Sequence, residues 1–249
     1  MDAGPDRSAR QAEFPTILLV HGAFAESSSW NEVVRSLKRR GYPVIAVANP
    51  LRGLKEDADY LRAVLDSRSE PVVIAGHSYG GSVMSEAADG AQGVQALVYV
   101  ASFSPDVGES TGELAAKFPG AELGAALHPV PLPLPGGGTG TDLYIQQDKF
   151  RHVFAADVAP DITELMAATQ RPIAASALEE TATRAAWKTI PSWTMITSQD
   201  LTIPLAAQRF MAERAGSTTV EIDASHAVAV SQPGPVADLI DTAARAATR

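Results

Sequence analysis

Short apolar runs that alternate with amphipathic helical segments constrain the fold of this chain more than any other feature. Helical stripes separate the runs, and in the first of them Trp30, Val33 and Leu37 recur at three-and-four spacing. Continuous apolar runs between such helices are typical of a parallel sheet covered on both faces. The sequence therefore predicts a three-layer α/β fold with a mostly parallel sheet, helices on both faces and strands buried on both faces. The expected strands are Thr16 to Val20, Pro43 to Ala48, Pro71 to Ala75, Gln95 to Ala101, Ser192 to Thr197 and Thr218 to Ile222.

The length of 249 residues suits a single α/β domain. We expect that domain to span residues 15–249 and residues 1–14 to form a mobile leader. Strand and helix signals stop alternating between about residues 104 and 190, where a Pro/Gly-rich piece precedes helical segments near 148–156, 161–169 and 174–186. This segment is expected to form a small helical lid inserted after the fifth core segment, between strands five and six. A second packing layer without a role in substrate choice is the alternative.

Composition and charge exclude several classes of function. The net charge of −9 leaves no broad basic surface, so nucleic acid is not an expected partner. No apolar run has the length of a membrane span, and Met1 to Pro15 contains no secretory signal pattern, so we expect a cytoplasmic protein without a membrane role. Because the chain has no cysteine, thiolate nucleophiles and cysteine-ligated metals are absent.

One short motif carries the chemistry. Gly76-His77-Ser78-Tyr79-Gly80 follows a predicted strand, and the residues from Gly80 to Ala88 can begin a helix. A Gly-x-Ser-x-Gly turn between a strand and a helix exposes its serine, and the two glycines avoid clashes in the tight turn. A Gly-rich connection that happens to hold a serine is the plain alternative. The context favours Ser78 as a nucleophile, which needs a base and oxyanion donors.

Three histidines follow Ser78 and could act as its base. His128 falls in the Pro-rich piece and His152 falls inside an expected lid helix. His226 instead comes shortly after the last predicted strand, at the carboxyl edge of the sheet where open α/β folds build their sites. The position predicts that His226 is the general base.

A carboxylate is expected to orient that histidine. Asp200 follows the strand that ends at Thr197, so it reaches the same sheet edge and can fix the imidazole tautomer. Asp223 lies too close to His226 in sequence, and Asp106 belongs to another strand end. Asp200 is therefore the predicted third member, although capping the helix after Pro204 would also explain it.

Oxyanion donors are expected from two backbone amides. One is the N–H of Tyr79, directly after the nucleophile, and the other comes from the loop after the first strand. Ala23 is the predicted donor in that loop, with Phe24 as the alternative. We expect His21 and His77 to support these loops through local hydrogen bonds.

These motifs resemble the α/β-hydrolase superfamily across nearly the whole chain. His21-Gly22, the Ser78 elbow, the Asp200 loop and the His226 loop match that superfamily in order and approximate spacing. Ala23, Ser225-His226 and the later Ser231-Gln232-Pro233 look like the small esterases related to plant methylesterases and hydroxynitrile lyases. The resemblance implies an α/β-hydrolase fold and a serine esterase mechanism.

Departures from related enzymes narrow the reaction that the resemblance implies. Hydroxynitrile lyases of this kind carry a lysine directly after the catalytic histidine and a threonine at the glycine position of His-Gly, whereas this chain has Ala227 and Gly22. Haloalkane dehalogenases carry an aspartate at the elbow, where this chain has Ser78. Cofactor-free perhydrolases keep the serine triad and stay open as an alternative.

The sequence thus predicts a serine hydrolase that cleaves a small carboxylic ester or lactone through an acyl-enzyme on Ser78. The alternatives are a perhydrolase or lyase on the same scaffold, and a hydrolase-derived ligand-binding protein with negligible turnover. Phe24 and Phe103 are expected to line an apolar substrate pocket. This chemistry requires no metal and no organic cofactor.

Overall fold

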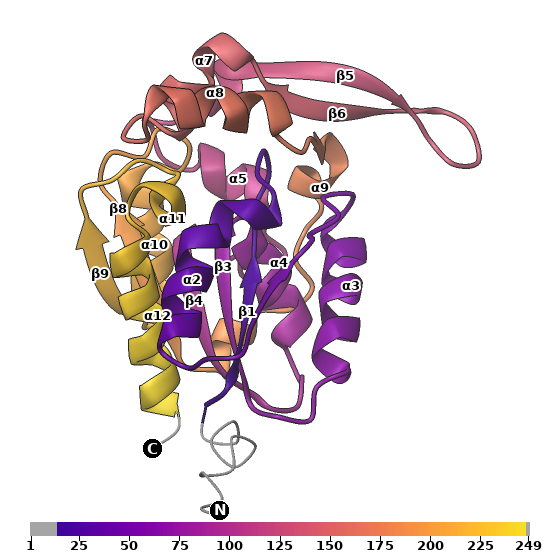
Figure 1. Ribbon diagram of the computed structural model, residues 1–249. Coiled ribbons are helices and arrows are strands. Elements are labelled where there is room, and N and C mark those ends of the chain that lie inside the picture. Colours follow the sequence, from indigo (N-terminus) through magenta and orange to yellow (C-terminus); the bar gives the residue numbers. More distant parts are fainter. Residues whose placement is uncertain (1–13, 248–249) are drawn as a thin grey trace, which may run out of the picture.

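The computed structural model describes residues 14–247, so the expected leader lies outside the described residues except for Phe14. Its main sheet has six strands in the order β2-β1-β3-β4-β8-β9, and every neighbouring pair is parallel (Figure 1). The predicted α/β architecture is confirmed. The strands are β1 (Thr16–Val20), β2 (Val44–Val47), β3 (Val72–Ser78), β4 (Val94–Ser102), β8 (Ser192–Thr197) and β9 (Thr218–Ile222).

Helices cover both faces of this sheet because successive strand residues point to opposite sides. In β1, Ile17 and Leu19 join one apolar cluster, whereas Leu18 and Val20 join the other. The first cluster lies under α2 (Asn31–Arg39) and α12 (Pro233–Ala247), and the second lies under α3 (Leu54–Asp66) and α4 (Tyr79–Ala88). Residues of η2 (Ser27–Trp30) and α11 (Val228–Ser231) join the first cluster, whereas α10 (Leu205–Arg214) packs into a third, smaller one. No helix within residues 14–247 is long and apolar enough to cross a membrane.

The two edge strands differ from the prediction that all strands are buried on both faces. In β9 the first four residues are exposed, and Val220 keeps 44% of its surface accessible. In β2 only the last residue, Val47, is buried. Both strands have a single neighbour in the sheet, so solvent reaches them from the side, and the prediction is wrong for these two strands.

The residues between β4 and β8 form the insertion that the sequence indicated (Figure 1). The insertion follows the fourth strand of the main sheet along the chain, so the expected position after the fifth core segment, between strands five and six, is wrong by one strand. Its helices are accompanied by an antiparallel three-stranded sheet that the sequence analysis did not predict. The elements are α5 (Thr111–Ala116), α6 (Leu123–Ala126), β5 (Leu127–Pro133), β6 (Thr139–Ile145), α7 (Gln147–Phe154), α8 (Pro160–Thr169), β7 (Ile173–Ala174), α9 (Ala175–Glu179) and η3 (Ala186–Lys188).

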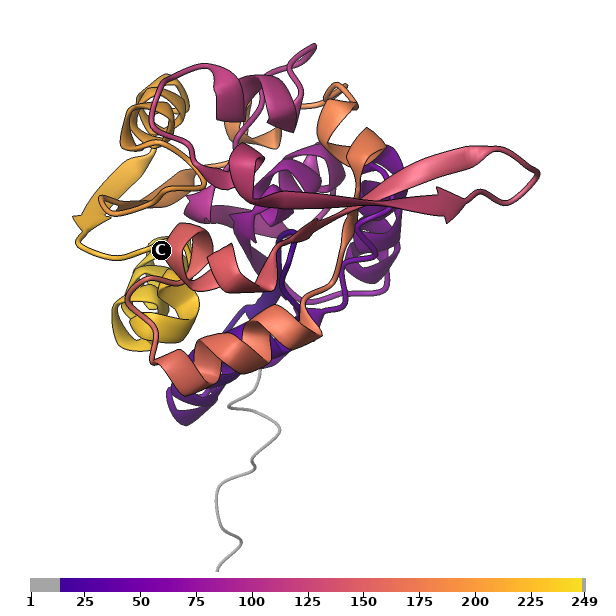
Figure 2. The same ribbon diagram turned by 90° about the horizontal axis from the view of Figure 1, so that it is seen from above.

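The Pro/Gly-rich piece is a hairpin of β5 and β6 that projects from the body of the molecule (Figure 2). Its prolines stand at every second position, 129, 131 and 133, while His128 and Val130 pair with Tyr144 and Asp142. Residues of a strand turn their N–H groups alternately to either side, so these prolines occupy the positions that face away from β6. The outer edge of β5 therefore lacks donors, which discourages another strand from pairing with it.

Candidate active site

The Ser78 elbow is a strained turn between β3 and α4. Ser78 has φ 54° and ψ −128°, a conformation that costs a serine on the order of 1–3 kcal/mol. A Cβ added at Gly80 would lie 2.4 Å from the carbonyl oxygen of Val20, and one added at Gly76 would lie 2.8 Å from the carbonyl of Gly80. Glycine at both positions allows the turn to pack this tightly against β1.

The end of β4 holds the elbow from the other side. The hydroxyl of Ser102 donates to the carbonyl oxygen of Ser78 at 2.7 Å, and the amide of Phe103 donates to the same oxygen at 3.3 Å. Ala101 has φ 44° and directs the chain toward these contacts. Neither Ala101 nor Ser102 could be predicted to contact the elbow, because a positive φ at alanine leaves no signal in the sequence.

Asp200 and His226 lie together at the carboxyl edge of the sheet. Nδ1 of His226 donates to Oδ2 of Asp200 at 2.7 Å, and both side chains are fully buried. Oδ1 of Asp200 accepts the amides of Thr202 and Ile203 at 2.7 and 2.8 Å. A buried carboxylate with this many donors is held firmly and fixes the ring orientation of the histidine.

The other ring nitrogen of His226 is free for chemistry. Its Nε2 is buried and makes no hydrogen bond with any described group, Ser78 included. The residue before Ser78 holds the imidazole in place: Nε2 of His77 donates to the carbonyl oxygen of His226 at 2.8 Å, and the ring centroids lie 4.7 Å apart. The Nδ1–H tautomer set by Asp200 leaves Nε2 as a proton acceptor.

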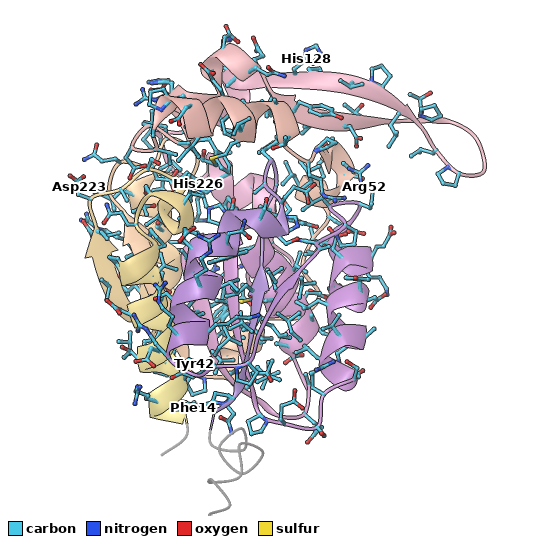
Figure 3. All side chains as sticks on the ribbon, viewed as in Figure 1. Phe14, Tyr42, Arg52, His128, Asp223 and His226 are labelled. Carbon is cyan, nitrogen blue, oxygen red and sulfur yellow. The ribbon has the colours of Figure 1, made fainter. Side chains whose placement is uncertain are left out.

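The rival groups considered from sequence lie elsewhere. Asp223 accepts a bond from Ser198 on the surface, and Asp106 pairs with Lys188. His152 pairs with Glu122 on the exposed side of the insertion, and Figure 3 shows His128 on the outer side of the insertion, away from His226. That leaves Asp200 and His226 as the carboxylate and imidazole that the structure brings together at the sheet edge.

The loop after β1 lies directly against the elbow. A Cβ at Gly22 would lie 2.6 Å from Cβ of Ser78 and 3.2 Å from the amide nitrogen of Tyr79. The amide of Phe24 donates to the carbonyl oxygen of Arg171 at 3.0 Å, whereas within residues 14–247 the amide of Ala23 has no such acceptor. Tyr79 is the first residue of α4, so its N–H has no partner inside the helix. Ala23 and Tyr79 thus have the free amides, and Phe24 does not.

We expect the Gly22→Ala variant to lose at least about tenfold in kcat, because the new methyl group must displace either Ser78 or the oxyanion loop. Gly124→Ala is the matched control, since a Cβ at Gly124 in α6 meets nothing within 4 Å. Steady-state hydrolysis of a p-nitrophenyl ester measures both. Equal kcat for the two variants would show that the loop tolerates a side chain at position 22.

His21 was predicted to support its loop, and Phe24 and Phe103 were predicted to line an apolar pocket. His21 accepts the amide of Asn49 at Nε2 (3.0 Å) and binds the carbonyl of Gly22 through Nδ1 (2.9 Å), so it braces the loop. Phe24 borders a cavity of about 130 Å³ beneath α8, and its ring lies 6.5 Å from that of Phe154. Phe103 packs instead into a separate apolar cluster with residues such as Leu114 and Ile203.

The insertion is attached to the loop that carries Asp200 and to the loop that carries His226. The hydroxyl of Thr202 donates to the carbonyl of Val153, and the amide of Ala227 donates to the carbonyl of Phe154, both at 2.9 Å. The Phe154 ring packs edge-on against the His226 imidazole with centroids 4.9 Å apart. The end of α7 therefore forms a wall of the candidate site and packs against His226, a long-range contact that no sequence motif reveals.

Burial dominates the electrostatics around the base. Desolvation, followed by the proximity of His226, lowers the pKa of His77 from 6.5 to about 3. Desolvation also lowers the pKa of His21. Both rings are neutral near pH 7, which suits their structural hydrogen bonds. Within residues 14–247 no group of three or more His, Asp or Glu side chains is arranged to hold a metal ion.

The parallel sheet, the strained serine elbow and the aspartate-held histidine at its carboxyl edge define an α/β hydrolase. Residues 17–239 match the model of the Alpha/beta hydrolase family, and the chain belongs to that family. It is 28% identical over 252 residues to the alpha/beta hydrolase nvfD of Aspergillus novofumigatus, with 92% of this chain and 96% of that protein covered.

Solved structures of esterases share the fold. Polyneuridine aldehyde esterase superposes with a TM-score of 0.80 at 20% identity, covering 92% of this chain and 98% of that one. A pyrethroid hydrolase from Sphingobium faniae superposes with a TM-score of 0.74 at 22% identity, covering 93% of this chain and 98% of that one. A methylesterase from Arabidopsis superposes with a TM-score of 0.74 at 16% identity, covering 92% of this chain and 98% of that one. The family resemblance predicted from the motifs is confirmed, and membership supports hydrolase activity.

Proposed function

We propose that this protein is a serine hydrolase that cleaves small carboxylic esters or lactones through an acyl-enzyme on Ser78. The observation that carries the proposal is the buried imidazole of His226: its Nδ1 is bound to Asp200 at 2.7 Å, and its Nε2 has no hydrogen-bond partner within residues 14–247. Burying a ring nitrogen without a hydrogen bond costs free energy, and a catalytic role as proton acceptor explains why the site keeps it. The esterase names of the structural neighbours agree with this chemistry.

In the proposed reaction, Oγ of Ser78 attacks the ester carbonyl carbon while Nε2 of His226 takes the hydroxyl proton. The resulting oxyanion accepts hydrogen bonds from the amides of Ala23 and Tyr79. As the C–O bond breaks, His226 returns the proton to the leaving alcohol. Water then attacks the acyl-enzyme, gives a proton to His226 and releases the acid, and the same proton restores the Ser78 hydroxyl.

The walls of the site support an apolar substrate of modest size. Phe24 and Phe154 flank the base and the oxyanion loop, and Ser78 retains only 5% of its surface accessible. The proposed nucleophile therefore lies at the bottom of its site, largely shielded from solvent. The segment around Phe154 is bonded to the loops that carry Asp200 and His226, which keeps this wall in place.

A fluorophosphonate probe and a panel of p-nitrophenyl esters test the proposal. We expect turnover of short acyl esters and a single covalent adduct that peptide mass spectrometry assigns to Ser78. The Ser78→Ala protein is the control and should show neither. An adduct on another residue, or no adduct and no turnover at any chain length, would reject the proposed nucleophile and favour a ligand-binding role.

A further inference from the structure

The side chain of Tyr79 ends in a buried ion-dipole contact that the proposed reaction does not use. Its hydroxyl donates to Oδ2 of Asp57 at 2.8 Å, and the two residues are 1% and 0% exposed. A carboxylate this deeply buried destabilises the fold unless several donors compensate it. An apolar residue on α3 would be less costly, so the position of Asp57 calls for a reason beyond packing.

Asp57 belongs to a chain of contacts that reaches the insertion. Its Oδ1 accepts the backbone amide of Arg52 at 3.0 Å. The guanidinium of Arg52 donates to Oδ1 of Asp142 in β6 at 2.7 Å and to the carbonyl of Pro172 at 3.0 Å. Figure 3 shows Arg52 where the loop after β2 meets the insertion. Asp57 thus links the elbow helix to two segments of the insertion.

The same loop also braces the other side of the elbow. Asn49, three residues before Arg52, donates its amide to Nε2 of His21 and its side-chain nitrogen to the carbonyl oxygen of His21, at 3.0 and 2.9 Å. His21 precedes the segment that carries the Ala23 amide. The loop between β2 and α3 therefore contacts both sources of the proposed oxyanion donors.

We propose that Asp57 and the hydroxyl of Tyr79 act as a positioning pair, which fixes the direction of the Tyr79 amide and joins it through Arg52 to the seated insertion. The inference rests on the proposed function. The peptide unit between Ser78 and Tyr79 carries the N–H donor, and Ser78 holds a strained φ of 54° that its surroundings must maintain. Anchoring Tyr79 at its far end restrains that peptide unit, and donors act only when aimed within a fraction of an ångström.

The Tyr79→Phe variant tests the pair, because it removes one hydroxyl and leaves the ring in place. We expect kcat to fall about tenfold with KM changed less than about twofold, since the oxyanion donor acts in the transition state. The Ki of a trifluoromethyl ketone, whose adduct with Ser78 carries an oxyanion, should rise by the same factor. Tyr99→Phe is the matched control: Tyr99 is also buried and its hydroxyl bonds Ser85 on the same helix at 2.7 Å.

A variant of Asp57 tests the other member of the positioning pair. Asp57→Ala, which cannot bond the Tyr79 hydroxyl, should reproduce the loss in kcat, and the double variant with Tyr79→Phe should lose no more than Asp57→Ala alone, because both act through one contact. Equal kcat and Ki for Tyr79→Phe and Tyr99→Phe, or additive losses in the double variant, would overturn the pair while leaving the esterase proposal intact. A wild-type protein without turnover or a Ser78 adduct would instead overturn the proposed function itself.

Discussion

Replacing Asp200 with Asn is expected to lower kcat by about 10⁴-fold while the protein stays folded, the magnitude known for this change in a serine protease triad. In the native site Oδ1 of Asp200 accepts the amides of Thr202 and Ile203, and Oδ2 accepts Nδ1–H of His226. An asparagine keeps its oxygen toward the two amides, which places its NH₂ group against Nδ1. His226 must then carry its proton on Nε2, where it can no longer accept the proton of Ser78.

The measurement is kcat for a p-nitrophenyl ester, together with a thermal melt that shows a folded protein. Asp223→Asn is the control, since Asp223 is a surface residue that bonds only Ser198 among the contacts described for its carboxylate. We expect its kcat to remain within about twofold of wild type. If Asp200→Asn retained more than about a tenth of the wild-type kcat, Asp200 would not be the residue that sets the tautomer of His226.

Features that depend on local sequence could be predicted well. The strands at 16–20, 192–197 and 218–222 coincide with the predicted runs. Ser78, Asp200 and His226 could be selected as candidates because each lies at or shortly after the end of a strand, and parallel strands end at one sheet edge. The hairpin of β5 and β6 was missed since prolines normally argue against strands. Their regular spacing at every second residue was the available signal.

Features that depend on long-range contacts left no pattern in the sequence. The bonds from Thr202 and Ala227 to the end of α7 join residues that are about 50 to 70 positions apart. Asp57 lies in the first turn of α3, where an acidic side chain favours the helix dipole, yet its carboxylate is buried against the Tyr79 hydroxyl. The position of such a residue in the sequence does not reveal which side chains will bury it.

The stability of the protein should fall steeply in mild acid because of His77. Burial lowers the pKa of His77 from 6.5 to about 3, so the folded state keeps the ring neutral while the unfolded state binds a proton below pH 6.5. Stability is therefore complete above about pH 6.5 and is lost as the pH falls toward 3. Between pH 6 and pH 4.5 this one group should remove about 2 kcal/mol from the free energy of unfolding. The titration of Asp57 changes stability in the opposite direction. Burial raises the pKa of its carboxyl, so the folded state binds that proton more tightly than the unfolded state does.

Other groups titrate in the same pH range. The contribution of His77 is therefore the difference between the stability lost by the wild type and the stability lost by a variant without this histidine. His77→Gln can keep a donor to the carbonyl of His226 but does not titrate. Urea unfolding followed by fluorescence of the three tryptophans should show the variant less stable at pH 7.5, yet with a loss between pH 6 and 4.5 that is smaller by about 2 kcal/mol. His152→Gln, an exposed histidine, should keep the wild-type loss. If the wild type and His77→Gln lost equal stability, His77 would have to accept its proton within the folded protein, and its bond to the His226 carbonyl would not require a neutral ring.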